Sequence, residues 1–345
     1  MIASQPRGEA VLSVTNTPRV TQVTRVQTNS SPTLARLARI GQVLLGVIWL
    51  IDGALQYQSY MFGRTFVTSV ILPNAQGQPG VIADPITWIA HLIEPHVAVF
   101  NGFAATLQVL IGLGLLYRRT VRPALLVSFV WVLGIWVTGE GLGGFFNDTA
   151  NPLTGAPGAA LLYLVIGLMV WPEGSIGGLG IQGRQLGLLG LRGSRMVFSV
   201  LWGVFAVLWL LPANDSASAV HDALGSVPTG TGWLSSLVGD AATATAGRGT
   251  GIALALAAIS GLIAFAVARN WHARTFLWIS IALAVLFWVF GQGFGGVLTG
   301  QATDVNTGPL LILFAGLLLG ASRVDQPRKQ PSLIQPTLVP DDRLT

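Results

Sequence analysis

The chain has 345 residues, of which 52% are hydrophobic and only 10% are charged, with a formal net charge of +5. Soluble domains carry about 25% charged residues, so this composition excludes an ordinary soluble protein and predicts an integral membrane protein. The chain has no cysteine, which excludes disulfides, iron–sulfur clusters and c-type haem attachment.

Eight apolar segments follow one another along the chain and predict membrane-spanning helices. They cover residues 40–57, 97–117, 121–138, 156–171, 196–212, 251–268, 275–292 and 307–321. A span needs about 20 apolar residues, and the fourth and eighth segments are shorter than that. Two long loops, 58–96 and 213–250, follow the first and fifth segments. We expect short helices in these loops, packed on the outer rim, with one starting at Asp84 before Pro85.

The basic residues orient the predicted spans because they gather in alternate loops. Only Arg64 and Arg248 lie in the other four loops. By the positive-inside rule, both termini are cytoplasmic and the two long loops face outward. Arginine far outnumbers lysine, since Lys329 is the only lysine, as is typical of a GC-rich bacterial genome. The predicted location is therefore the bacterial cytoplasmic (inner) membrane, with membrane lipid and not nucleic acid as a partner.

An internal repeat divides the chain into two similar parts. IWVTGEGLGG (135–144) matches FWVFGQGFGG (287–296) with six identities in ten at an offset of 152, and Trp49 aligns with Trp209. An even number of spans in each unit makes the repeat parallel. The predicted fold is thus an all-α integral membrane protein of eight transmembrane helices in two parallel four-helix repeats.

This fold gives five predicted regions. They are a disordered cytoplasmic arm at 1–35, a first membrane unit at 36–172, a cytoplasmic linker at 173–195, a second membrane unit at 196–322 and a cytoplasmic tail at 323–345.

The glycines at Gly139-x-Gly141-x-x-Gly144 have the spacing of a dinucleotide-binding fingerprint. That fingerprint requires a strand before the glycines, whereas an apolar helix precedes them here, so no nucleotide is expected. The glycines instead predict the end of a helix and a tight turn. The alternative is a small-molecule binding site, in which the glycine backbone lets a ligand come close. Its candidate cofactor-binding residues are Gly141, Gly144, Asn101 and Trp136.

Acidic residues within the predicted spans indicate where chemistry could occur. Asp52 lies late in the first span and Glu140 lies at the outer end of the third. An aspartate at the centre of a span costs about 2.5–3.5 kcal/mol, so such groups are functional candidates. Together with His96, which lies near the same depth, they form the candidate catalytic set for proton exchange.

The stretch HLIEPH supplies a candidate metal site. His91 and Glu94 are three residues apart on one face of a predicted helix, and His96 follows closely. Histidine and glutamate in this pattern are possible metal ligands, and interfacial helix residues are the alternative interpretation.

The second unit lacks the ionisable groups of the first. The ionisable groups of the first unit are Asp52, His91, Glu94, His96 and Glu140. The positions aligned with them in the second unit hold, in the same order, Pro212, Ser236, Gly239, Ala241 and Gln292. We therefore expect the amino-terminal unit to hold the site and the carboxy-terminal unit to support it.

The four-span unit resembles the DoxX/DoxD family. The resemblance rests on ARIGQVLLGVIWLIDGALQ (38–56), on the long loop that follows it and on a second span that ends in LIGLGLLYRR (110–119). The family's usual basic residue late in the first span is absent, and Gln56 stands nearest to its place. The resemblance implies a membrane subunit associated with quinone-linked oxidation of reduced sulfur compounds, or with membrane redox complexes.

Three functions remain open at this level. The first is an oxidoreductase subunit that binds quinone and contacts other membrane redox subunits. In it, Asp52 and Glu140 would exchange protons with the quinone head group, and His96 would donate a hydrogen bond. The second is a structural or assembly subunit without chemistry of its own. The third is a small-solute transporter, because parallel repeats suit the rocking of two halves.

Overall fold

The computed structural model describes residues 32–172, 186–230 and 232–324, and within these ranges the secondary structure is helical, without strands. Six helices are long and apolar enough to cross a membrane by length and composition: Pro32–Leu55, Gly80–Leu116, Val121–Thr138, Gly190–Leu208, Gly249–Ala268 and Ala273–Thr299. Two further apolar helices, Ala159–Met169 and Thr307–Arg323, are shorter. The chain is therefore an all-α, multi-pass membrane protein.

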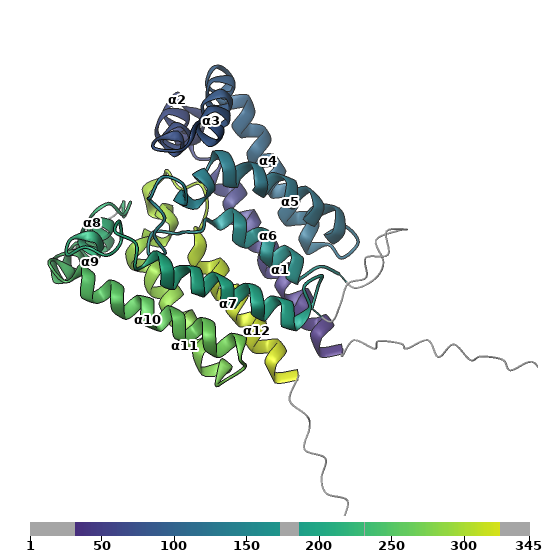
Figure 1. Ribbon diagram of the computed structural model, residues 1–345. Helices are drawn as coiled ribbons and strands as arrows, with labels where there is room; N and C mark the ends of the chain where they lie inside the picture. Colours follow the sequence, from purple (N-terminus) through teal and green to yellow (C-terminus); the bar gives the residue numbers. More distant parts are fainter. Residues whose placement is uncertain (1–31, 173–185, 231, 325–345) are drawn as a thin grey trace, which may run out of the picture.

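The long and the shorter apolar helices form one bundle. They are α1 (Pro32–Leu55), α4 (Val97–Leu116), α5 (Val121–Thr138), α6 (Ala159–Met169), α7 (Gly190–Leu208), α10 (Gly249–Ala268), α11 (Ala273–Leu286) and α12 (Thr307–Val324). Helices α1, α6, α7 and α12 pack together at the centre, with α4 and α5 on one side and α10 and α11 on the other (Figure 1). We call residues 32–172 the first half and residues 186–324 the second half.

Short helices cover one end of the bundle, which we call the cap end. Those of the first half are η1 (Ser59–Phe62), α2 (Arg64–Phe66), η2 (Val67–Ile71), η3 (Leu72–Ala75), α3 (Gly80–Ile93) and η4 (Glu94–His96), and those of the second are α8 (Ala219–Gly225) and α9 (Gly232–Thr245). The two described ends of the chain lie at the opposite end of the bundle (Figure 1). The prediction of short helices in the two long loops is confirmed.

The cap of the first half has a small hydrophobic core of its own, in which Met61, Val67 and Ile86 are fully buried. Its main helix begins at Gly80 and not at Asp84 as expected. The helix starts earlier because the carbonyl of Pro79 already accepts hydrogen bonds from the amides of the third and fourth residues after it.

Three predicted boundaries also move. Helix α1 begins at Pro32, so the end of the arm predicted to be disordered at 1–35 is helical. Proline is tolerated there because the first turn of a helix needs no N–H from it. Helix α7 begins at Gly190 within the predicted linker 173–195, and α12 continues to Val324. Residues 1–31 of the arm, 173–185 of the linker and 325–345 of the tail lie outside the described residues.

The two glycine-rich segments form the same turn. Gly141 and Gly293 both have φ 52°, and Gly143 and Gly295 have φ 69° and 73°. These are left-handed conformations that glycine adopts without strain. A Cβ atom at Gly143 would collide with the backbone of Pro157. The glycines thus end a helix and allow close backbone contact, as the sequence predicted.

Candidate functional site

A cavity of about 270 Å³ lies at the cap end, lined mainly by residues of the first half. Helices α1, α4, α5 and α6 form its walls, and η2 and α3 of the cap contribute apolar side chains. Its polar lining residues are Asp52, Gln56, Asn101, Gln108, Thr138, Glu140, Tyr163, Thr303 and Asp304. None of the described residues that line it is basic. The arrangement is a mainly apolar chamber with several acids and no cation to neutralise them.

Asp52 anchors one wall of the cavity. It is buried near the end of α1, with 2% of its surface exposed. Its Oδ2 accepts a hydrogen bond from the hydroxyl of Tyr163 on α6, and its Oδ1 accepts one from the backbone N–H of Val305 at 3.1 Å. Asp52 therefore links α1 both to its own half and to the loop that precedes α12 in the second half.

A second contact fixes the same loop. The side-chain amide of Gln56 donates a hydrogen bond to the carbonyl of Thr303 at 2.9 Å. Asn101 on α4 in turn donates to the carbonyl of Gln56 at 2.7 Å. These bonds hold the loop against the cap end of α1, so that Asp304 lies at the cavity.

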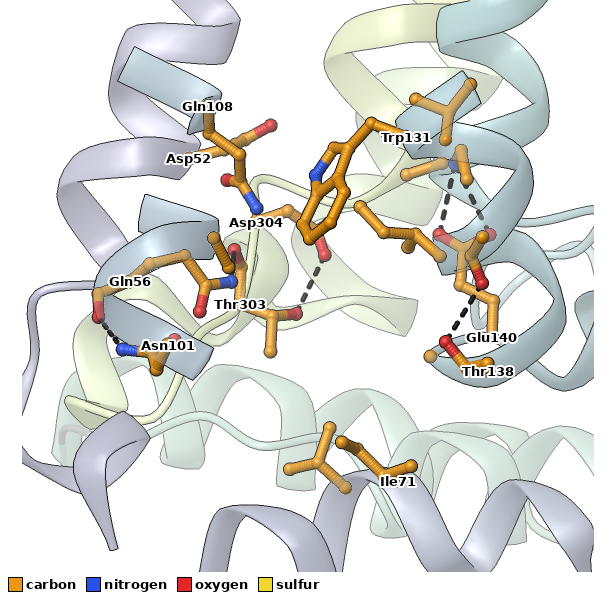
Figure 2. A pocket seen from close by; sticks show the side chains of 18 of the residues that line it. Asp52, Gln56, Ile71, Asn101, Gln108, Trp131, Thr138, Glu140, Thr303 and Asp304 are labelled. Carbon is orange, nitrogen blue, oxygen red and sulfur yellow. Dashed lines mark hydrogen bonds between the residues drawn. The ribbon is translucent and has the colours of Figure 1, made fainter. Parts of the chain in front are cut away.

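Glu140 lies on the opposite side of the cavity from these residues, and Trp131 projects between the two groups (Figure 2). The residue directly follows the α5 helix and its C-cap glycine. Its Oε1 and Oε2 accept the backbone N–H of Ala160 at 3.0 and 3.3 Å. The carboxyl group thus caps the N-terminus of α6, where the helix dipole favours negative charge.

Burial opposes that preference. Burial and, second, the nearby Asp304 carboxylate raise the pKa of Glu140 from 4.5 to about 8, against the opposing effect of the amides of Ala160 and Ala159. At pH 7 the Glu140 carboxyl is therefore mainly protonated, able to donate a hydrogen bond and to exchange a proton near neutrality.

Asp304 is a site residue that the sequence did not indicate. Its carboxylate accepts hydrogen bonds from the backbone N–H of Asn306 at 2.6 Å and from the hydroxyl of Thr303 at 2.7 Å. Burial nevertheless raises its pKa above the ordinary value. In the sequence it belongs to a polar connection, which normally indicates a solvated turn. The aspartate two residues before an asparagine predicts only a local turn.

Asp304 belongs to the second half, which therefore contributes an ionisable group to a site that we expected the first half to hold and the second half to support. The loop that carries Asp304 crosses to α1, because its backbone pairs with Asp52 and Gln56. The site is composite.

Three buried polar atoms around the cavity have no hydrogen-bond partner among the described residues. They are the indole Nε1 of Trp49, the indole Nε1 of Trp131 and the Oε1 of Gln108. A buried polar group without a partner costs about 1–3 kcal/mol. These atoms belong to residues that line the cavity and are themselves closed to solvent, so their hydrogen-bonding capacity is unused beside it.

The three predicted catalytic residues do not all line the same cavity. Asp52, Glu140 and the predicted cofactor-binding residue Asn101 line one cavity, whereas His96 does not. His96 is exposed in a 3-10 turn between α3 and α4, which forms where Pro95 cannot supply an N–H to a continuous α-helix.

The predicted metal ligands also stay apart. His91 Nδ1 and Glu94 Oε2 are 4.0 Å from each other on α3 and the turn after it. Across the part of the chain that the structure describes, no three histidine or acidic side chains form a group able to hold a metal ion.

Three other predicted cofactor-binding residues have structural roles. Trp136 donates its indole N–H to the carbonyl of Pro157 at 2.8 Å and so holds the loop before α6. Gly141 packs against Asn74 of the cap, and Gly144 packs against the backbone after it in the turn. None of the three lines the cavity.

The fold and the cavity define a multi-pass all-α membrane protein with a partly enclosed acidic chamber at one end of its spans. Comparison with known protein families, characterised proteins and solved structures found no match for this chain.

Proposed function

We propose that this protein is the quinone-binding membrane subunit of a redox system and that the cavity holds the quinone head group. The observation that carries the proposal is the chamber itself. A carboxyl group with a pKa of about 8 and the side chains of Trp49 and Trp131, whose indole N–H groups have no partner among the described residues, line a mainly apolar space. A quinone head group needs hydrogen-bond donors for its carbonyl oxygens and an apolar surface for its ring.

The chemistry follows from the balance of protons. Reduction of a quinone to a quinol consumes two electrons and two protons. We propose that Glu140 donates one proton to a quinone oxygen. The carboxyl groups of Asp52 and Asp304 together supply the second proton to the other quinone oxygen. A partner redox subunit that oxidises a reduced sulfur compound supplies both electrons, as the resemblance to the DoxX/DoxD family implies. Each carboxyl is then reprotonated from the cap end.

We further infer eight spans in two parallel four-helix repeats. The matched turns at Gly141 and Gly293 support this, as do the equivalent bonds from Trp136 to Pro157 and from Trp288 to Val305. Helix α6 has 11 residues and is shorter than the hydrocarbon layer. Because most of its residues are buried, the irregular backbone before it is shielded from lipid.

We also infer that the cap end faces outward from a bacterial inner membrane with both termini in the cytoplasm. The basic residues of the loops at the opposite end support this orientation. The quinone would then be reached from the outer leaflet.

The cavity favours ligand binding over a purely structural role, because a fully packed cap would leave no such space. It also favours a site on one side of the membrane over a transport path. The lining residues of α1 lie at its carboxyl-terminal end and those of α4 at its amino-terminal end, which are both at the cap end.

The test uses the full chain purified into lipid nanodiscs. Quinone extracted from the preparation is identified by mass spectrometry, and binding of a quinone analogue is measured by calorimetry on wild type and on Trp131→Phe. Loss of one indole donor removes a hydrogen bond of about 0.5–1.5 kcal/mol, which weakens binding by roughly 2- to 12-fold. Wild-type protein that carries no quinone and binds no analogue would overturn the proposal.

A further inference from the structure

A second, apolar space adjoins the acidic cavity. It is a surface groove of about 480 Å³ between α4 and α5, lined by Phe103 and Leu107 on one helix and by Leu126, Val127 and Val130 on the other. These side chains lie on the flank of the bundle, where Phe103 and Val130 are 59% and 76% exposed. In a membrane protein this flank faces hydrocarbon.

The groove and the cavity share two lining residues, Trp131 and Gly134. Of these two shared residues, Gly134 has no side chain. A Cβ atom added there would meet no other atom within 4 Å. The glycine thus leaves free space on α5 at the point where the cavity and the lipid-facing groove share their lining.

The lining of the cavity restricts the head group that it can accept. Asp52, Glu140 and Asp304 all line it, and the described lining residues include no basic one. An anionic head group would meet like charges, or would force carboxyls to remain protonated, with no cation to offset its desolvation. A neutral group that accepts hydrogen bonds from the indoles of Trp49 and Trp131 has no such cost.

We infer that the ligand is an amphiphile whose neutral head group occupies the cavity and whose long apolar chain leaves past Gly134 into the groove between α4 and α5. The inference rests on the proposed function for the position of the head group. It adds the path of the chain, the charge of the head group and the residue that keeps the path open. The occupant of the groove is the chain of the bound ligand, because groove and cavity share the lining residues Trp131 and Gly134.

The experiment blocks the passage with Gly134→Leu in the full chain in nanodiscs. Two probes share one benzoquinone head group, and one carries a long saturated chain while the other carries only a methyl group. Gly134→Leu should fold, because the position is helical and open and leucine has a higher helix propensity than glycine. Gly102→Leu on α4 is the matched control, because it is also open but lines neither space.

The expected result is that Gly134→Leu weakens binding of the long-chain probe about tenfold or more relative to binding of the methyl probe, which is about 1.4 kcal/mol. Gly102→Leu should bind both probes like wild type. Equal binding of the long-chain probe to wild type and Gly134→Leu would overturn the chain path. Equal weakening of both probes would overturn it too, because the substitution would then act on the head group.

Two further outcomes separate the parts of the inference. A long-chain fatty acid should not compete with the long-chain quinone, and competition at equal concentration would overturn the neutral head group. Failure of both quinone probes to bind wild-type protein would overturn the proposed function itself.

Discussion

The side chains of Glu140 and Gln292 make the same contact in the two halves of the protein. Glu140 Oε1 accepts the N–H of Ala160 at 3.0 Å, and Gln292 Oε1 accepts the N–H of Gly308 at 3.1 Å. Each residue follows a long helix and caps the next one. A neutral amide is therefore sufficient for the cap, and the ionisable carboxyl group of Glu140 is available for another purpose.

Exchanging the two residues should separate fold from function. The free energy of unfolding of Glu140→Gln should lie within about 0.5 kcal/mol of that of wild type, because the amide oxygen preserves the cap. Proton exchange with bound quinone should be lost in this variant. Gln292→Glu should be less stable by about 1–3 kcal/mol. It removes the amide donor to Thr307 from a fully buried position. Unfolding in detergent and quinone-coupled proton uptake are the measurements. Equal loss of stability in both variants would contradict the assignment.

The stability of the protein should depend on pH through Glu140. Its pKa rises from 4.5 to about 8 on folding, so the folded state holds this proton more tightly than the unfolded state. The contribution of this proton to the free energy of unfolding is fully present below about pH 4.5 and is lost as the pH rises through about 8. Thermal melts between these values should show a falling midpoint in wild type and a smaller fall in Glu140→Gln. Parallel curves would argue against a raised pKa.

Asp304→Asn should lower the pKa of Glu140. The carboxylate of Asp304 is the second cause that raises it, after burial, so removal of that charge favours the Glu140 anion. The asparagine oxygen can still accept the N–H of Asn306. Infrared titration of the protonated carboxyl band, assigned by its loss in Glu140→Gln, measures the shift. Asp84→Asn on the exposed surface of α3 is the control and should leave the titration unchanged.

Tyr163 and Asp52 should be energetically coupled. Tyr163→Phe removes the hydroxyl that donates to the buried Asp52, at an expected cost of about 1–3 kcal/mol. Tyr117→Phe, on the exposed end of α4, should change stability by less than about 0.5 kcal/mol. A double-mutant cycle of Tyr163→Phe with Asp52→Asn should give a coupling energy of about 0.5–3 kcal/mol. Additive effects would show that the bond does not contribute.

Two glycines of the α5 region should respond oppositely to alanine. Gly143→Ala should cost more than about 1 kcal/mol, because its φ of 69° is left-handed and a Cβ would strike Pro157. Gly134→Ala should gain up to about 1 kcal/mol, because it is helical and open. The difference is read from chemical unfolding of both variants. A loss of stability in Gly134→Ala would contradict the open passage.

The sequence determined the class of the protein and most of its helices. Scarce charge and long apolar segments are sufficient to place helices in a membrane, since each span satisfies its own backbone hydrogen bonds. Helix α5 covers the predicted 121–138, and α4 begins at the predicted 97. The repeated glycines predicted their turns because a left-handed conformation is a local property of the residue. The sequence also indicated Asp52 and Glu140 as candidate site residues, because an acidic residue in an apolar segment is energetically costly.

The tertiary structure alone decided which groups share the site. Asp304 joins it through a hydrogen bond between residues 253 positions apart, from Val305 to Asp52. No local pattern encodes such a contact. His96 shares the approximate depth of the acids but points elsewhere, because depth along a span does not fix the direction of a side chain. Composition and periodicity thus determine where helices lie, whereas the packing of loops from one half onto helices of the other decides which side chains meet.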